Sequence, residues 1–226
     1  MNKPYIICYM MTSIDGRIDC KMTENLRGVE DYYKTLDELD IKSTLSGRVT
    51  AELEMALAGK FVSKNCEHPN TNLFVKHNDA AGYDIICDTN GILLWDDEVN
   101  YSKPHIIITS QMVATDYLAY LDSKNISYIV AGKDKIDLAL ATSILYDSFN
   151  IKRLGVVGGA KINTGFLKAN LLDEIVLLIG AGINARASYP TMFDGLSDDS
   201  EVIQLKLNDV KRFESDAVLL SYKVIK

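Results

Sequence analysis

The chain has 226 residues, 47% of them hydrophobic, and a formal net charge of −7 at pH 7. A chain of this length and composition can fill a substantial core, which argues against intrinsic disorder. The acidic balance offers no basic field for nucleic acid or an anionic membrane surface, although a few backbone N–H groups and one arginine are enough to bind a phosphorylated small molecule.

Targeting and membrane signals are weak in this sequence. The apolar run 5–11 is too short for the core of a signal peptide. The longest apolar stretch, residues 175–183, is interrupted by two glycines and falls below the roughly 20 residues that a membrane-spanning helix needs. The four cysteines are scattered without CxxC spacing, which favours reduced thiols. We therefore predict a cytoplasmic protein without a membrane partner.

The first predicted element is a strand. Residues 5–11 form a continuous apolar run, typical of a strand buried on both faces, and residues 12–16 supply turn chemistry. Acidic and apolar residues then mix at helical spacing over residues 29–39, which predicts an amphipathic helix. Residues 43–49 predict a short strand, and Thr50 is expected to cap the helix that follows.

The middle and the end of the chain alternate predicted strands and helices. Residues 60–82 show no sustained period and predict an irregular surface segment. Further strands are expected over residues 83–87, 105–109, 126–130, 154–157 and 175–179, and helices over residues 117–121, 137–149 and 164–170. The last apolar segments, 202–207 and 217–224, have no long helix between them and predict antiparallel strands at one edge.

These elements predict a single α/β domain over residues 1–226. The alternation favours a mixed, mostly parallel sheet that is flanked by helices and ends in antiparallel carboxyl-terminal strands. No internal repeat, low-complexity tract or Pro- or Gly-rich linker divides the chain.

The most informative motif is a pair of glycines between a strand and a helix. Residues 156–160 read Val-Val-Gly-Gly-Ala. Two glycines let the backbone approach a ligand closely, and the exposed N–H groups of the next turn attract a diphosphate such as that of a dinucleotide. The pattern does not match GxGxxG, so a tight turn without a ligand fits these residues equally well.

A second phosphate-binding turn is predicted at residues 47–50. A strand ends there at a helix, where Thr50 serves as the cap and Arg48 is a candidate to bind a phosphate, although Arg48 alone fits a solvated surface charge better. Both turns fall at the carboxyl ends of predicted neighbouring strands, where open α/β sheets bind ligands. Glu54 lies one helical turn after Thr50 and is a candidate acid in the same cleft, but its spacing fits an ordinary exposed glutamate better.

Three polar side chains follow the first predicted strand. Ser13, Asp15 and Arg17 supply a hydroxyl, a carboxylate and a guanidinium, a set suited to hold a polar heterocycle or a sugar. The alternative is a plain Asp-Gly turn.

Metal and triad chemistry have little support. The segment 66–68 (Cys-Glu-His) has no second Cys/His pair at useful spacing, so we predict no metal. His77 and His105 have no recognisable nucleophile as a partner, and no GxSxG motif is present.

The order of these motifs closely resembles the reductase domain of bacterial riboflavin biosynthesis, whose fold resembles dihydrofolate reductase. The resemblance rests on residues 13–18, residues 47–50, residues 157–160 with Asn163, and residues 171–175, and it covers nearly the whole chain. It implies a three-layer dihydrofolate reductase-like fold and NADPH as the cofactor. It also implies reduction of 5-amino-6-(5-phosphoribosylamino)uracil, whose ribose becomes a ribityl chain.

The resemblance further implies roles for individual residues. The implied cofactor-binding residues are Gly47, Arg48, Thr50, Gly158, Gly159, Ala160, Lys161 and Ile162. Ser13, Asp15 and Arg17 would border the nicotinamide and bind the substrate, and Glu54 would be the catalytic acid. The family pattern also implies a homodimer, without metal.

The sequence departs from the family pattern at two places that concern substrate recognition. Val157 stands where family members that act on the riboflavin intermediate usually carry a glutamate before the paired glycines. After Thr50, residues 54–57 (Glu-Met-Ala-Leu) keep an acid but lack the usual proline. The zinc deaminase motifs of bifunctional members are missing, so we predict no deamination.

Three alternatives stay open at this point. They are a related small carbonyl or imine substrate, dihydrofolate reduction, and a catalytically silent nucleotide-binding module, the last motivated by Val157. The sequence also leaves open the choice between NADPH and NADH, because one or two cations suffice to bind a 2′-phosphate.

Overall fold

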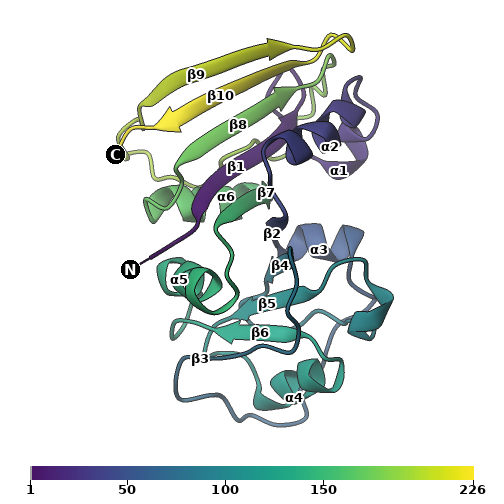
Figure 1. The fold of residues 1–226 in the computed structure, drawn as a ribbon, viewed down its shortest axis with the longest axis vertical. Coiled ribbons are helices and arrows are strands. Elements are labelled where there is room, and N and C mark those ends of the chain that lie inside the picture. The colour runs from purple at the N-terminus through teal and green to yellow at the C-terminus, as the bar shows by residue number, and fades with distance from the viewer. Residues whose placement is uncertain (1) are drawn as a thin grey trace. The chain divides into compact units, whose positions relative to one another are not determined.

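The computed structural model describes residues 2–226, a series of strands and helices that begins with a strand at Tyr5 (Figure 1). The strands are β1 (Tyr5–Thr12), β2 (Ser43–Gly47), β3 (Leu73–Val75), β4 (Asp84–Cys87), β5 (His105–Thr109), β6 (Ser127–Val130), β7 (Arg153–Gly158), β8 (Glu174–Ile179), β9 (Leu205–Arg212) and β10 (Val218–Val224). The helices are α1 (Cys20–Thr23), α2 (Val29–Glu38), α3 (Arg48–Glu54), the 3₁₀ turn η1 (Glu98–Asn100), α4 (Thr115–Ser123), α5 (Leu138–Ser148) and α6 (Ala160–Lys168).

The chain forms two compact units, each with its own array of strands and its own core. The first unit contains Ser43–Lys152 and the short segment that ends at Pro4, and the second contains Tyr5–Lys42 and Arg153–Lys226. Each unit is therefore assembled from separate stretches of sequence. The single domain expected over residues 1–226 stays a prediction.

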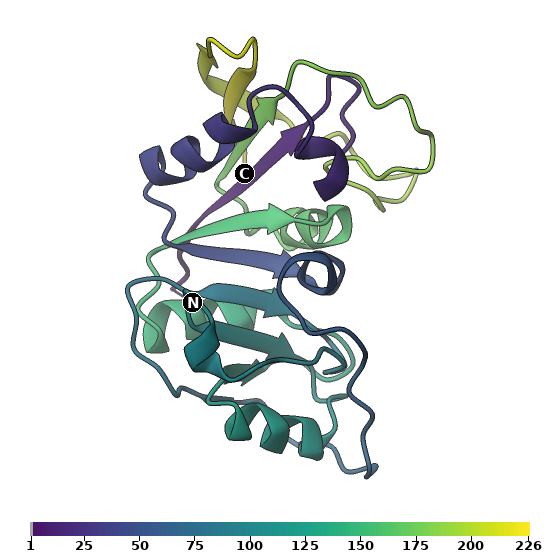
Figure 2. The same cartoon turned by 90° about the vertical axis from the view of Figure 1, so that its right-hand side faces the viewer.

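The first unit has five strands in the order β3-β6-β5-β4-β2. Strands β2, β4, β5 and β6 pair in parallel, and β3 adds an antiparallel edge. In Figure 2 the parallel strands, coloured blue to teal, point the same way, so their carboxyl ends share one edge. The β3 strand lies inside residues 60–82, where the sequence predicted irregular structure.

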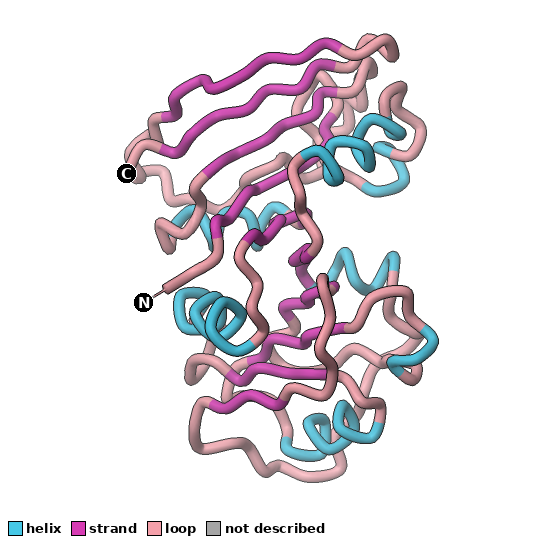
Figure 3. The backbone as a smooth tube through the Cα atoms, viewed as in Figure 1, coloured by secondary structure: helices cyan, strands magenta, loops and turns pink. Residues whose placement is uncertain are grey.

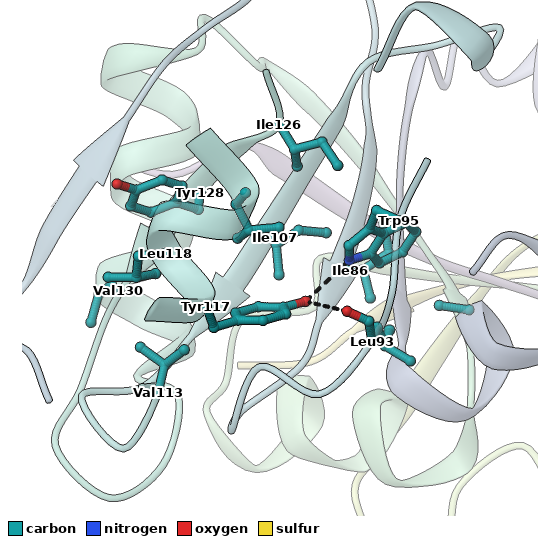
Figure 4. Close-up of a cluster of buried hydrophobic side chains, with 12 residues drawn as sticks. Ile86, Leu93, Trp95, Ile107, Val113, Tyr117, Leu118, Ile126, Tyr128 and Val130 are labelled. Atoms are coloured by element: carbon teal, nitrogen blue, oxygen red, sulfur yellow. Dashed lines mark hydrogen bonds between the residues drawn. The ribbon is translucent and has the colours of Figure 1, made fainter. Parts of the chain in front are cut away.

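Helix α4 covers one face of this array. Ile86, Ile107 and Tyr128 are aligned across three strands and pack with Tyr117 of α4 in a buried cluster. Burial of each large apolar side chain stabilises the fold by about 1.5–3 kcal/mol. Figure 4 shows the Tyr117 hydroxyl accepting a hydrogen bond from Trp95 Nε1 at 3.1 Å and donating one to the backbone oxygen of Leu93 at 3.0 Å. These bonds satisfy polar groups that the cluster buries.

The second unit has five strands in the order β7-β1-β8-β10-β9. Strands β7, β1 and β8 are parallel, and β10 and β9 follow as antiparallel strands, as Figure 3 shows along the upper part of the tube. Its core packs apolar residues of β1 and β8 against α2, where the rings of Tyr9 and Tyr32 stack with centroids 4.5 Å apart. The predicted antiparallel carboxyl-terminal strands are thus confirmed.

None of the helices in residues 2–226 is long and apolar enough to cross a bilayer. Within the same residues, no group of three or more His, Cys, Asp or Glu side chains is placed to hold a metal ion.

Candidate active site

The paired glycines lie at the junction of β7 and α6 in the second unit. Gly158 ends the strand and is buried, and Gly159 is the N-cap of the helix, which begins at Ala160 rather than at the expected residue 164. The backbone oxygen of Gly159 accepts from the N–H groups of Ile162 and Asn163 at 3.0 Å each. The N–H groups of Ala160 and Lys161, which precede these two, have no acceptor within the helix, so this turn offers backbone donors to a ligand.

The space beside Gly159 is open. A Cβ atom added at this residue would meet no heavy atom within 4 Å. Asn163, farther along α6, is not accessible to a ligand, because it is fully buried. Its Nδ2 donates to the backbone oxygen of Met192 at 2.8 Å. Val157, at the place of the family's glutamate, is only half-buried. The turn therefore offers backbone donors and free space without an acid.

The predicted turn at residues 47–50 joins β2 to α3 in the first unit. Its cap is Gly47, in extended conformation, and the helix already begins at Arg48. The prediction that Thr50 caps this helix was wrong, because Thr50 already lies inside the first helical turn. The guanidinium of Arg48 contacts the carboxylate of Glu52 at 2.8 Å, and both side chains are partly exposed. A surface pair of this kind contributes little to stability, so Arg48 can exchange its partner.

Glu54 is the last residue of α3. It is exposed and lies four residues after Thr50, so the two share a helix face as expected.

Asp88 follows β4 in the first unit, and sequence analysis overlooked it. Its side chain is buried, and Oδ2 accepts from the N–H groups of Ile92 and Leu93 at 2.7 and 2.9 Å, while Oδ1 has no hydrogen-bond partner. Burial raises the pKa of this carboxyl, opposed by the two backbone donors and by the positive charge of Arg48. An Asp before Thr-Asn-Gly after an apolar run is the signal that sequence reasoning had available.

The loop after β1, in the second unit, contains the predicted substrate-binding residues. The carboxylate of Asp15 accepts from Ser13 Oγ at 2.7 Å and from the backbone N–H groups of Asn184 and Ala185 at 2.9 and 3.0 Å. These donors lower its pKa to about 2, with the Asn184 N–H as the largest cause. Arg17 donates to the backbone oxygen of Tyr189 at 2.6 Å. Ser13, Asp15 and Arg17 are therefore tied to the segment that follows β8.

The three histidines contact structural partners. His68 Nδ1 lies 2.9 Å from the backbone oxygen of Val113, and His77 Nε2 lies 2.9 Å from a carboxylate oxygen of Asp122. His105 is buried beside Glu98. None of these arrangements contains a nucleophile positioned by a histidine.

A cavity of about 580 Å³ lies in the first unit, before the start of β5 and β6, with Pro104, Lys124 and Asn125 among its lining residues. None of the predicted site residues lines it. The two glycine turns lie instead at the carboxyl ends of β2 and β7, the kind of position where open α/β sheets bind ligands.

Comparison with known proteins identifies the family of this chain. Residues 4–219 match the model of the RibD C-terminal domain. The chain belongs to this family. A curated relative from Aquifex aeolicus, named 2,5-diamino-6-ribosylamino-4(3H)-pyrimidinone 5′-phosphate reductase, is 26% identical over 205 residues, covering 86% of this chain and 84% of the relative. The prediction of a riboflavin-biosynthesis reductase domain is thereby confirmed.

Solved structures show the same fold as this RibD C-terminal domain. A pyrimidine reductase-like protein from Corynebacterium diphtheriae superposes with a TM-score of 0.72 at 20% identity, covering 99% of this chain and 92% of the other. The riboflavin biosynthesis reductase of Saccharomyces cerevisiae gives a TM-score of 0.60 at 17% identity, with 99% and 90% covered. The mixed, helix-flanked sheet predicted from the sequence is confirmed.

Proposed function

We propose that this chain uses NADPH to reduce the ribose of a ribosylaminopyrimidine 5′-phosphate to a ribityl chain. When bound, the cofactor supplies hydride to the opened, imine-like carbon of the sugar, and a proton goes to the adjacent nitrogen. The substrate is 5-amino-6-(5-phosphoribosylamino)uracil or the diaminopyrimidinone after which the Aquifex relative is named. Family membership supports the reaction class. Because Val157 departs from the family pattern, the turnover experiment below decides which of the two pyrimidine rings is the substrate.

The observation that carries the cofactor assignment is the open turn at Gly159. A diphosphate needs backbone N–H donors and room beside them, and this turn combines free helical donors with an empty position at the glycine. We assign the diphosphate to Gly158, Gly159, Ala160, Lys161 and Ile162.

Arg48 supplies a second phosphate contact in this proposal, with Gly47 and Thr50 beside it. Its partner Glu52 is a surface carboxylate that a phosphate can replace, because an Arg–phosphate contact is charge-assisted in the same way. We assign the 2′-phosphate to Arg48, which makes NADPH the preferred cofactor.

Glu54 is the proposed acid of the reaction. Glu54 is the acid of the family pattern that this sequence keeps, and Val157 stands where the pattern has its second acid. An exposed carboxylate at the end of α3 is free to orient a polar ring or to pass a proton to the nitrogen that hydride transfer leaves basic.

The proposal includes a cytoplasmic homodimer. Strand β9 is the edge of the second unit, and its Leu205, Leu207 and Val210 are exposed. Exposed apolar edge strands tend to be covered by a partner. Light scattering at two protein concentrations measures the oligomeric state.

Turnover is the experiment that tests the reaction. Loss of nicotinamide absorbance is followed with the uracil and diaminopyrimidinone phosphates, with dihydrofolate and with a panel of small carbonyl compounds. We expect oxidation of NADPH with one of the two ribosylaminopyrimidines. Turnover of dihydrofolate alone, or binding of NADPH without any turnover, contradicts the proposal.

Variants separate the assigned roles. Gly159→Val fills the open position and should weaken NADPH binding strongly, whereas Ala169→Val, at the exposed other end of α6, should not. Arg48→Ala should reduce affinity for NADPH more than for NADH. Glu52→Gln, which removes the carboxylate partner of Arg48, should raise affinity for NADPH more than for NADH.

Glu54→Gln should lower kcat by ~10²–10⁴-fold with NADPH affinity unchanged. Normal NADPH affinity in a folded Gly159→Val protein would exclude the diphosphate from this turn.

A further inference from the structure

Two loops of the second unit are joined at the carboxyl ends of β1 and β8. Besides the three bonds to the Asp15 carboxylate, the N–H of Ile14 donates to the backbone oxygen of Gly182 at 2.8 Å. The loop 13–17 and the segment 182–186 therefore form one structural element, in which Asp15 supplies most of the connections.

The segment 182–186 contains a backbone conformation that needs support. Ala185 has φ +57°, in the left-handed region, where a residue with a Cβ is disfavoured by roughly 1–2 kcal/mol. The N–H of this same residue donates to Asp15 Oδ2. Strained residues of this kind persist where neighbouring contacts fix them and are concentrated at functional sites.

The joined loops present two large apolar side chains to solvent. Ile14 is 64% exposed and Ile183 is 72% exposed. Ile14 itself donates to Gly182, and Ile183 lies between Gly182 and Asn184, so these bonds hold the backbones of Ile14 and Ile183 close together. Aliphatic side chains beside polar backbone groups are suited to the face of a flat heterocycle.

We propose that Asp15 is a positioning residue that holds the segment 182–186 against the loop 13–17, so that Ile14 and Ile183 form the surface on which the pyrimidine ring of the substrate packs. This inference rests on the proposed function and gives Asp15 a different role from the substrate contact that the family resemblance implies. The carboxylate acts through the backbone it binds. It remains charged at neutral pH, since its pKa is about 2, and it has no proton to give.

Asp15→Asn tests the proposal. The amide keeps one acceptor oxygen and replaces the other by an NH₂ group, so one of the backbone bonds to residues 184 and 185 is lost. We expect KM for the pyrimidine substrate to rise about tenfold, the equivalent of one charge-assisted hydrogen bond. We expect kcat and NADPH affinity to stay within about twofold, with the same KM defect at every pH from about 5 to about 8.

Matched variants isolate the surface from the fold. Asp194→Asn disturbs a carboxylate that accepts from the N–H and the hydroxyl of nearby Thr191, and it should leave KM unchanged. Ile183→Ser should raise KM as Asp15→Asn does, and Ile183→Leu should retain the wild-type value. A loss confined to kcat, or a KM that Asp15→Asn and Ile183→Ser leave unchanged, overturns the proposal.

Hydrogen exchange distinguishes failure of this inference from failure of the proposed function. The amides of Asn184 and Ala185 should exchange faster in Asp15→Asn than in the wild-type chain, with or without substrate. Unchanged exchange contradicts the positioning role directly. If the wild-type chain reduces neither pyrimidine, the proposed function fails and the substrate surface fails with it, while the exchange result still decides whether Asp15 fixes the segment.

Discussion

Two turns of this chain each contain an aspartate followed by a glycine with positive φ, but their surroundings differ. In the second unit, Asp15 follows β1 and precedes Gly16, which has φ +74°. In the first unit, Asp88 follows β4 and is three residues before Gly91, which has φ +65°. Each carboxylate accepts two backbone N–H groups. The pKa of Asp15 is nevertheless lowered to about 2, whereas that of Asp88 is raised.

Burial accounts for the difference. Asp88 is 1% exposed, and removal from water penalises its charge more than its two hydrogen bonds favour it. The Asp15 side chain is partly exposed, and the hydrogen bonds prevail. Two backbone bonds, joined at Asp15 by the Ser13 hydroxyl, thus accompany a stabilised anion at the exposed turn and a destabilised one at the buried turn.

The largest expected effect is that of Gly91→Ala. An added Cβ would lie 2.6 Å from Val113 Cγ2 and would also overlap the ring of Tyr117, in a backbone conformation that already disfavours a side chain. Overpacking and left-handed strain together predict a loss of about 3–5 kcal/mol in the free energy of unfolding. Urea titration measures it. If Gly91→Ala lost less unfolding free energy than Gly16→Ala, the buried turn would accommodate a Cβ atom at residue 91 despite its close contacts.

Asp88→Ala should have the next largest effect. It leaves the N–H groups of Ile92 and Leu93 without their acceptor, and we expect a loss of about 2–3 kcal/mol in the free energy of unfolding. Asp88→Asn keeps an acceptor oxygen and should stay within about 1 kcal/mol of the wild-type protein. Equal losses in the two variants would mean that the charge of Asp88, rather than its acceptor, stabilises the turn.

Gly16→Ala should have a smaller effect. No heavy atom lies within 4 Å of the added Cβ, so only the left-handed backbone opposes it, at about 1–2 kcal/mol. Urea titration of Gly16→Ala and Gly91→Ala gives the comparison. KM for the pyrimidine substrate shows whether the altered turn disturbs the segment 182–186 that Asp15 holds. A loss as large as that of Gly91→Ala contradicts the open surroundings of Gly16.

Sequence periodicity was sufficient for most strands and for the class of fold, because buried strands and amphipathic helices depend on local patterns of apolar residues. It failed at β3, a three-residue edge strand in a polar segment, which pairs with β6 more than 50 residues later in the chain. It also placed the cap of α3 at Thr50, because side-chain preference favours threonine, whereas Gly47 ends the strand in a conformation that starts the helix sooner.

The candidate site was predicted less completely than the fold, for a related reason. The glycine turn at Gly159 is a local motif, and the structure leaves it as open as the motif requires. The bonds of Asp15 join residues about 170 positions apart, and no local pattern indicates such a contact. Asp88 was overlooked because its Asp-Thr-Asn-Gly context indicates only a turn, whereas its burial is a property of the fold.

The smallest expected effects are those of pH, and they have opposite signs in the two turns. The folded-state pKa of Asp15 lies below its ordinary value of 3.8, so its contribution to stability is complete above that value and is lost as the pH falls toward about 2. The folded-state pKa of Asp88 lies above 3.8, so its charge destabilises the fold at neutral pH, and this penalty disappears as the pH falls through the raised pKa.

Relative to the wild-type protein, Asp15→Asn should therefore be less stable at neutral pH and Asp88→Asn equally or more stable. Both differences should shrink on acidification. Urea unfolding of the three proteins at about pH 7 and about pH 3.5 measures them. If both variants are destabilised at pH 7 and their differences from the wild-type protein do not depend on pH, burial does not separate the two carboxylates, and the contrast between the turns reduces to their glycines.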